Sequence, residues 1–141
     1  MQFAGSVLCK HSIERHVNGA PPVSIDIVGH AIVSADGMIA DRDHRMPAAL
    51  RSEADWRRFQ AALDSAALVV LGRLGHEAHP NPGRKRLVVT SRAAWLERDP
   101  GDDNIMLWNP DGISFRRVLA GLGIADGTIA VTGGQRVFDL F

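Results

Sequence analysis

The amino-acid sequence predicts an α/β fold in which a mostly parallel central sheet is flanked by helices, giving three α/β/α layers. From residue 24 onward, short β-branched runs alternate with stretches of helical periodicity, an order typical of parallel strands covered on both faces. The 141 residues, 45% apolar and 23% charged, suit one soluble domain with a substantial core. No internal repeat or low-complexity tract interrupts this alternation.

Each expected element has a local signal. Residues 25–33 form a β-branched run, and residues 67–71 are fully apolar, as a strand buried on both faces would be. Ser52 with Asp55 three residues later marks a helix start, and Gly123 marks a helix end. We therefore expect, in order, a strand at 25–33, a helix at 52–65, strands at 67–71, 86–90 and 105–108, a helix at 114–122, a strand at 128–132 and the opening of a helix at 135–141.

Residues 1–22 differ from the rest of the chain. They show no sustained strand or helix period and contain Asn18-Gly19 and Pro21-Pro22, so we interpret them as an arm before a domain at 23–141. The strand at 25–33 would then be an apolar sheet edge, and such an edge is an aggregation template unless it is covered. We expect residues 3–13 of the arm or a second subunit of a homodimer to cover it, unless the sequence derives from a longer parent.

Charge and composition argue against several classes of function. Sixteen basic side chains balance sixteen acidic ones, which is not the charge balance of a nucleic-acid or anionic-membrane binder. One cysteine, Cys9, cannot form an internal disulfide, and no apolar run approaches the roughly 20 residues that span a bilayer. The first ten residues lack the pattern of a secretory signal. We expect a cytoplasmic protein that acts on a small molecule.

Glycine-rich turns after the strands are the candidate ligand site, because α/β proteins bind ligands beyond the carboxyl ends of their strands. Gly133-Gly134 lies between a buried strand and a helix, where backbone N–H groups can approach a pyrophosphate. Gly72-Arg73 with Gly75 repeats the arrangement and adds a guanidinium able to bind phosphate oxygens. For the double glycine, an alternative of about equal weight is that it only makes the turn.

A third turn, Thr90-Ser91-Arg92, offers hydroxyls and a cation at the distance of an adenosine phosphate. Its equally weighted alternative is a simple ST-turn with a solvated arginine.

Glu53 is the candidate acid. It lies in the first turn of the helix at 52–65, three residues before Trp56 on the apolar stripe, and is expected to point toward the sheet edge. The alternative is that Glu53 only complements the helix dipole, an effect of ~0.3–1 kcal/mol. Full burial in an apolar pocket can raise a carboxyl pKa by up to about 3–5 pH units, so burial decides between these roles.

Other notable side chains have structural interpretations. Trp56 and Phe59 are expected in the core, whereas Trp95 and Trp108 are expected to cover sheet edges. The segment His76-Glu77-Ala78-His79 lacks the spacing of two ligands on one helix face and stands before a loop, so no metal is expected. No serine lies in a nucleophile elbow.

Several segments follow one another in a recognisable order. They are Ser34-Ala35-Asp36-Gly37-Met38-Ile39-Ala40, Met46-Pro47, Leu50-Arg51-Ser52-Glu53, Val69-Val70-Leu71-Gly72-Arg73, Arg86-Leu87-Val88-Val89-Thr90-Ser91-Arg92 and Val131-Thr132-Gly133-Gly134-Gln135-Arg136-Val137-Phe138. From about residue 25 to residue 141 the chain resembles the dihydrofolate reductase fold. The related reductase domain of the bifunctional riboflavin-biosynthesis deaminase-reductase shares the strand, Gly-Arg and Gly-Gly elements.

The resemblance implies an NADPH-dependent reductase that transfers hydride to a C=N or C=O bond of a pterin-like or ribitylamino-pyrimidine substrate. It implies that Glu53 is the active-site carboxylate, that residues 38–47 form a loop closing over the nicotinamide, and that the Gly-Gly peptide is cis. The implied cofactor-binding positions are Ile32, Ile39 and Ala40 around the nicotinamide, Gly72, Arg73 and Gly75 at the pyrophosphate and 2′-phosphate, Ser91 and Arg92 at the adenosine, and Gly133, Gly134, Gln135 and Arg136 at the second pyrophosphate cradle.

The chain departs from the family pattern in three places. Ala48 stands where the family usually has tryptophan, and Gly75 and Ala78 stand where it has phosphate-binding hydroxyls. The family also continues beyond the position of Phe141 through further strands, including a terminal antiparallel pair. The alternatives to a reductase are therefore a catalytically idle NADPH-binding or nucleotide-binding relative and an oligomeric scaffold.

Overall fold

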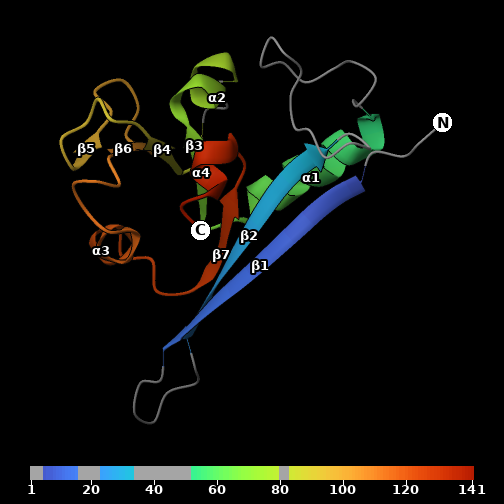
Figure 1. Ribbon diagram of the computed structural model, residues 1–141, viewed down its shortest axis with the longest axis horizontal. Coiled ribbons are helices and arrows are strands. Elements are labelled where there is room, and N and C mark those ends of the chain that lie inside the picture. The colour runs from blue at the N-terminus through green and yellow to red at the C-terminus, as the bar shows by residue number, and fades with distance from the viewer. Residues whose placement is uncertain (1–4, 16–22, 34–51, 80–82) are drawn as a thin grey trace.

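The structure is a computed structural model that describes residues 5–15, 23–33, 52–79 and 83–141 (Figure 1). Its elements are β1 (Gly5–Arg15), β2 (Val23–Val33), α1 (Glu53–Ser65), β3 (Leu68–Gly72), α2 (Arg73–Ala78), β4 (Arg86–Val89), β5 (Leu96–Arg98), β6 (Ile105–Trp108), α3 (Phe115–Gly121), β7 (Gly127–Val131) and α4 (Gln135–Phe138). The seven strands of the described segments form one sheet in the order β1-β2-β7-β3-β4-β6-β5. The inner pairs are parallel, and β1 and β5 run antiparallel at the two edges. The α/β class is confirmed.

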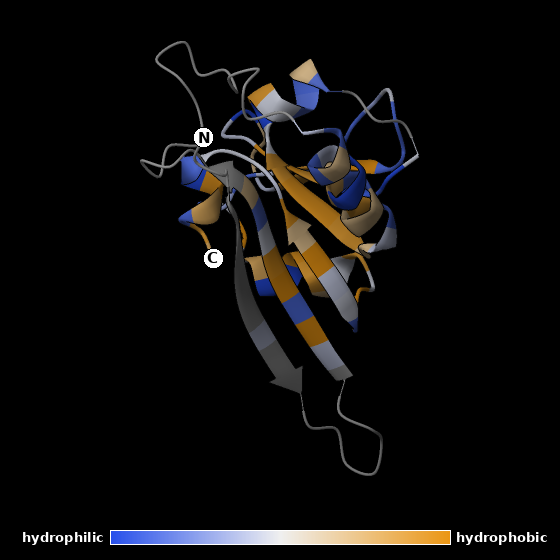
Figure 2. Ribbon diagram, turned by 90° about the vertical axis from the view of Figure 1, so that its right-hand side faces the viewer, coloured by the Kyte–Doolittle hydropathy of each residue, from blue (hydrophilic) through white to orange (hydrophobic). Residues whose placement is uncertain are grey.

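Alternate residues of the inner strands enter two apolar cores, one on each face of the sheet. Leu68 and Val70 of β3 belong to one core, which α3 and α4 cover with Val118, Leu119 and Val137. The other core takes Val69 and Leu71 of β3 and is covered by Leu63 of α1. A strand buried on both faces must be continuously apolar, which explains the apolar run of β3, coloured orange in Figure 2. No helix of the described residues is long and apolar enough to cross a membrane.

The strand β1 corrects the interpretation of residues 1–22 as an arm outside the core fold. All of β1 pairs with β2, from Gly5 opposite Val33 to Arg15 opposite Val23, and the two form a long hairpin along one side of the molecule (Figure 1). The edge of β2 is therefore covered from within the chain. This agrees with the expectation that the N-terminal residues, rather than a second subunit, cover it. Because β1 already occupies that edge, the reason for expecting a homodimer there is removed.

The sequence does not predict α2 or β5. The helix α2 starts directly after Gly72, has no side-chain cap and contains Gly75, a residue that disfavours helices. The strand β5 is only three residues long and pairs with β6 alone. Both elements have too few residues for a periodic signal, so their neighbours in the fold determine them.

The helix α1 begins as its sequence predicts. Ser52 is the N-cap, and its side-chain oxygen accepts a hydrogen bond of 3.3 Å from the Asp55 N–H. The expectation that Trp56 lies in the core is wrong, because half of Trp56 is exposed, although its ring packs at a tilt against Phe59. Phe59, in turn, packs against the second core.

Trp108 does not cover a sheet edge as expected. Trp108 is 2% exposed and lies in the first core, where its indole N–H donates to the Ile113 carbonyl over 2.8 Å. Buried tryptophan needs such a partner, and Ile113 supplies it. Trp95, by contrast, is 66% exposed.

His30 gives the fold a specific pH dependence. Its ring packs edge-on against Phe59, and desolvation lowers its pKa from the ordinary value of 6.5. At pH values between the lowered pKa of His30 in the folded chain and 6.5, the unfolded chain binds more protons than the folded chain. The free energy of unfolding therefore falls as the pH falls through this window. We expect His30→Gln to flatten this dependence in urea unfolding measured at several pH values between about 5 and 8. An unchanged pH dependence in the variant would show that other groups cause it.

Candidate functional site

Two glycine corners meet at the carboxyl edge of the sheet. The strands β3 and β7 are parallel neighbours, and the Thr132 N–H donates to the Val70 carbonyl over 2.9 Å, which extends their pairing into the corner. A Cβ atom on Gly133 would lie 2.7 Å from the Gly72 nitrogen and 3.1 Å from the Leu71 Cα. The two corners are therefore in direct backbone contact, as the sequence interpretation of a joint site requires.

The second glycine of the pair faces open space. A Cβ on Gly134 would meet no atom within 4 Å, and its φ of +38° is one that L side chains rarely adopt. The N–H groups of Gln135 and Arg136 have no acceptor among the described residues, and both side chains are exposed. With only four residues, α4 has a small dipole, so any anion here would be bound by individual N–H groups.

The peptide bonds of the described residues are all trans. The cis Gly133–Gly134 peptide that the resemblance implies is therefore not present. The turn is made instead by the positive φ of Gly134.

An arginine beside the corners pairs with a carboxylate, and a second arginine lies at the same edge of the sheet. Arg73 donates to both carboxylate oxygens of Glu77, over 2.7 and 2.9 Å, one turn further along α2. The hydrogen bond from Arg73 is the main cause that lowers the Glu77 pKa, and the charge of Arg92 contributes as well. Arg73 follows β3 and Arg92 follows the neighbouring parallel strand β4, so both arginines belong to the carboxyl edge of the sheet.

The turn after β4 is the simple ST-turn that the sequence allowed as the alternative to a phosphate-binding turn. The Arg92 N–H donates to the Thr90 hydroxyl over 3.2 Å, which is an ST-turn, and Ser91 and Arg92 are exposed. This turn leaves the Arg92 guanidinium facing solvent, without an ion pair among the described residues. The cation expected here is present, while the hydroxyl of Thr90 already serves the turn.

Gly75 and Glu53 do not take their expected environments. Gly75 lies inside α2 rather than in a phosphate-binding turn, because the helix begins at Arg73. The Glu53 side chain is 78% exposed and pairs with Arg57 one turn along α1. Glu53 therefore stands on the solvent side of α1, and the buried carboxyl needed for a tuned acid is not formed. The positive end of the helix dipole stabilises an acidic side chain in the first turn, which is the alternative role considered for Glu53.

The nicotinamide positions are only partly described. Ile32 pairs with Ser6 through the β1–β2 ladder. Ile39, Ala40, the segment at 38–47 and Ala48 lie outside the described residues.

His76 has a structural partner. Its Nδ1 lies 3.0 Å from a guanidinium nitrogen of the buried Arg86, and because arginine only donates, Nδ1 accepts this hydrogen bond. No group of three metal-ligating side chains occurs among the described residues, and His76, Glu77 and His79 are not brought together with a further ligand.

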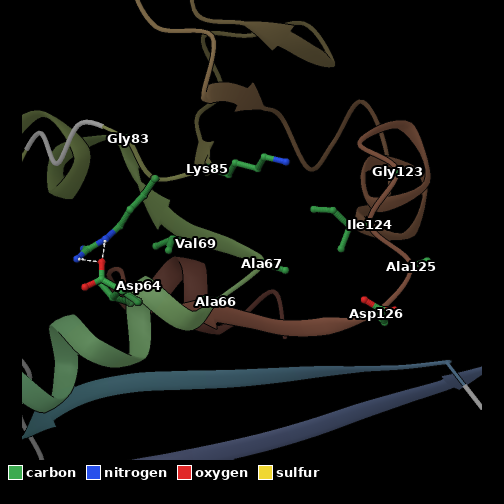
Figure 3. A pocket seen from close by; sticks show the side chains of 12 residues that line it. Asp64, Ala66, Ala67, Val69, Gly83, Lys85, Gly123, Ile124, Ala125 and Asp126 are labelled. Atoms are coloured by element: carbon green, nitrogen blue, oxygen red, sulfur yellow. Dashed lines mark hydrogen bonds and ion pairs between the residues drawn. The ribbon is translucent and has the colours of Figure 1, made fainter.

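A hollow of about 550 Å³ lies at the opposite edge of the sheet, before β3, β4 and β7 begin (Figure 3). The ion pair of Arg84 and Asp64, 2.6 Å apart, closes one end, while Lys85 and Asp126 lie at its rim. The sequence interpretation missed it, because no motif marks these loops. Its size alone does not make it the stronger candidate, since parallel sheets bind ligands at the carboxyl edge.

No protein-family model matches the chain, and no curated protein is significantly similar to it.

Proposed function

We propose that this chain binds NADPH along the carboxyl edge of its sheet and acts as a cytoplasmic reductase of the dihydrofolate reductase superfamily. The observation that carries the proposal is the backbone contact between Gly133 and Gly72. It supports a single site, because two corners that touch can present their N–H groups to one pyrophosphate. Gly134, with open space around it, leaves room for that approach.

The pairing of Arg73 with Glu77 does not oppose phosphate binding. Glu77 is solvent-exposed, and water screens an exposed ion pair of this spacing so that it contributes little to stability. The arginine also precedes the glutamate along the helix, the less favourable order. A phosphate carries more negative charge than a carboxylate and could contact Arg92 as well as Arg73, so it would compete with Glu77 for Arg73.

NADPH, when bound, supplies the hydride for reduction of a C=N or C=O bond in a pterin-like or ribitylamino-pyrimidine substrate. The corner N–H groups and the two arginines would hold its phosphates and fix its position. Glu53 would bind the substrate ring and deliver a proton to it. For this role its ion pair with Arg57 has to open.

The exposure of Glu53 favours a second candidate, a catalytically idle relative that binds NADPH without reducing a substrate. A carboxylate in water is not held at a fixed distance from a substrate atom, and catalysis depends on such positioning. The two candidates share the cofactor site and differ only in turnover.

Glu53→Gln separates them. In a reductase we expect turnover with dihydrofolate or a ribitylamino-pyrimidine to fall by roughly 10²–10⁴-fold, because general acid catalysis contributes that much, with NADPH affinity kept within a few-fold. Asp55→Asn, in the same helical turn, is the matched control and should keep its turnover. NADPH oxidation is followed by absorbance. Binding without turnover in the parent chain would establish the idle relative, and unchanged turnover in Glu53→Gln would remove Glu53 from the mechanism.

A further inference from the structure

The polar features of the carboxyl edge follow one another in strand order. The glycine corners lie at the ends of β7 and β3, Arg73 follows β3, and Arg92 follows β4. Beyond β4 come β6 and then the edge strand β5, and Trp95, the residue directly before β5, is level with the carboxyl end of β6. The Asn109 N–H donates to the Trp95 carbonyl over 2.8 Å, and Leu96 pairs with Trp108, the last residue of β6.

The Trp95 ring is exposed although its backbone is firmly held. Ala93 beside it is buried, and the Asn109 side chain donates to the Ala93 carbonyl over 3.0 Å. The Ala94 N–H donates to Glu97 over 2.7 Å. The loop also packs backbone to backbone on Gly112, where a Cβ would lie 2.4 Å from the Ala94 oxygen. With the loop fixed in this way, Trp95 keeps 66% of its surface in solvent.

An exposed indole on a held backbone is suited to stacking on a flat aromatic ring. Tryptophan offers a large apolar face, and a held backbone reduces the entropy lost on binding. Strands lie about 4.8 Å apart, so Trp95, directly before β5, is two strand spacings, or roughly 10 Å, from β4, the strand that Arg92 follows. A nucleoside spans a comparable length between its phosphates and the far side of its base.

We propose that Trp95 is the stacking platform for the adenine base of the dinucleotide. The phosphates lie at the glycine corners and the two arginines, and the adenosine extends from Arg92 along the sheet edge toward the start of β5. This inference rests on the proposed NADPH site and adds to it a residue that selects for a base rather than for phosphate.

The test compares ligands that share phosphates and differ in the base. Calorimetric titrations use NADPH, ADP and inorganic pyrophosphate with the full chain and with Trp95→Ala, Trp95→Phe and Trp56→Ala. Trp95→Ala should weaken ADP and NADPH binding by roughly 5- to 150-fold, the range for removing an aromatic ring that stacks on a base, while pyrophosphate binding stays unchanged. Trp95→Phe should retain most of the affinity. Trp56→Ala, which removes another exposed indole, should change none of the three.

Each outcome has a distinct meaning. ADP should quench indole emission in Trp56→Ala and not in Trp95→Ala. If the parent chain binds NADPH and Trp95→Ala binds it equally well, the stacking role is wrong while the cofactor site stands. Equal weakening of ADP and pyrophosphate would show a loop collapse and also overturn it. If the parent chain binds none of the three, the proposed function fails and the platform with it.

Discussion

Gly133→Ala is expected to destabilise the fold by about 3 kcal/mol, the upper range for overpacking a tight interior. The new Cβ would lie 2.7 Å from the Gly72 nitrogen and 3.1 Å from the Leu71 Cα, and neither backbone atom can rotate away. The strands β3 and β7 would have to separate at the corner. For a chain of this length, such a loss lowers the melting temperature by roughly 10 °C in a thermal unfolding experiment.

Gly75→Ala is the matched control for this substitution. Gly75 lies inside α2 with no atom within 4 Å of an added Cβ. Alanine is the better helix former by about 0.8–1.0 kcal/mol, so the control should be neutral or slightly stabilising. If Gly133→Ala melted at the temperature of the parent chain, the two corners would not touch in solution.

Gly134→Val is expected to abolish NADPH binding. Gly134 faces open space, so the valine side chain meets no protein atom and instead occupies the volume through which a pyrophosphate would reach the backbone. The φ of +38° also strains a β-branched residue, and Gly134→Ala therefore accompanies it as the milder variant. Alanine should weaken NADPH binding less than valine does. Binding is measured by NADPH fluorescence and folding by circular dichroism.

Undiminished NADPH affinity in either folded variant would contradict a cofactor that contacts this corner. Since Gly133 and Gly134 are adjacent, the two substitutions also distinguish a packing glycine from a binding one. The first should cost stability, and the second should cost chiefly affinity.

The central part of the fold follows from its sequence because its signals are strong and local. The strand β6 has the residue bounds that the sequence predicts, and β3, β4 and β7 each agree within one or two residues. Continuous apolar runs between turn residues leave few alternatives. The position of both glycine corners at one edge was also predictable from parallel strands, whereas their contact depends on the pairing of β3 with β7.

Other features depend on contacts between distant residues, which no local pattern records. The sequence of β1 carries no strand periodicity, and its pairing with β2 across the sheet edge defines it. Glu53 has the spacing of an inward-facing residue, yet Arg57 one turn later provides a partner in solvent. Trp95 is placed by the hydrogen bonds of Asn109 and the close approach of Gly112, both from another loop.

The central claim is that one dinucleotide site lies at the carboxyl edge of the sheet. Titration of the ¹⁵N-labelled chain with NADPH, followed through its glycine amide signals, tests it directly. We predict saturable shifts at Gly72, Gly133 and Gly134, with Gly83 and Gly123 in the hollow at the amino edge unmoved. Shifts confined to Gly83 and Gly123, or no shift at any of these glycines at high NADPH concentration, would contradict it.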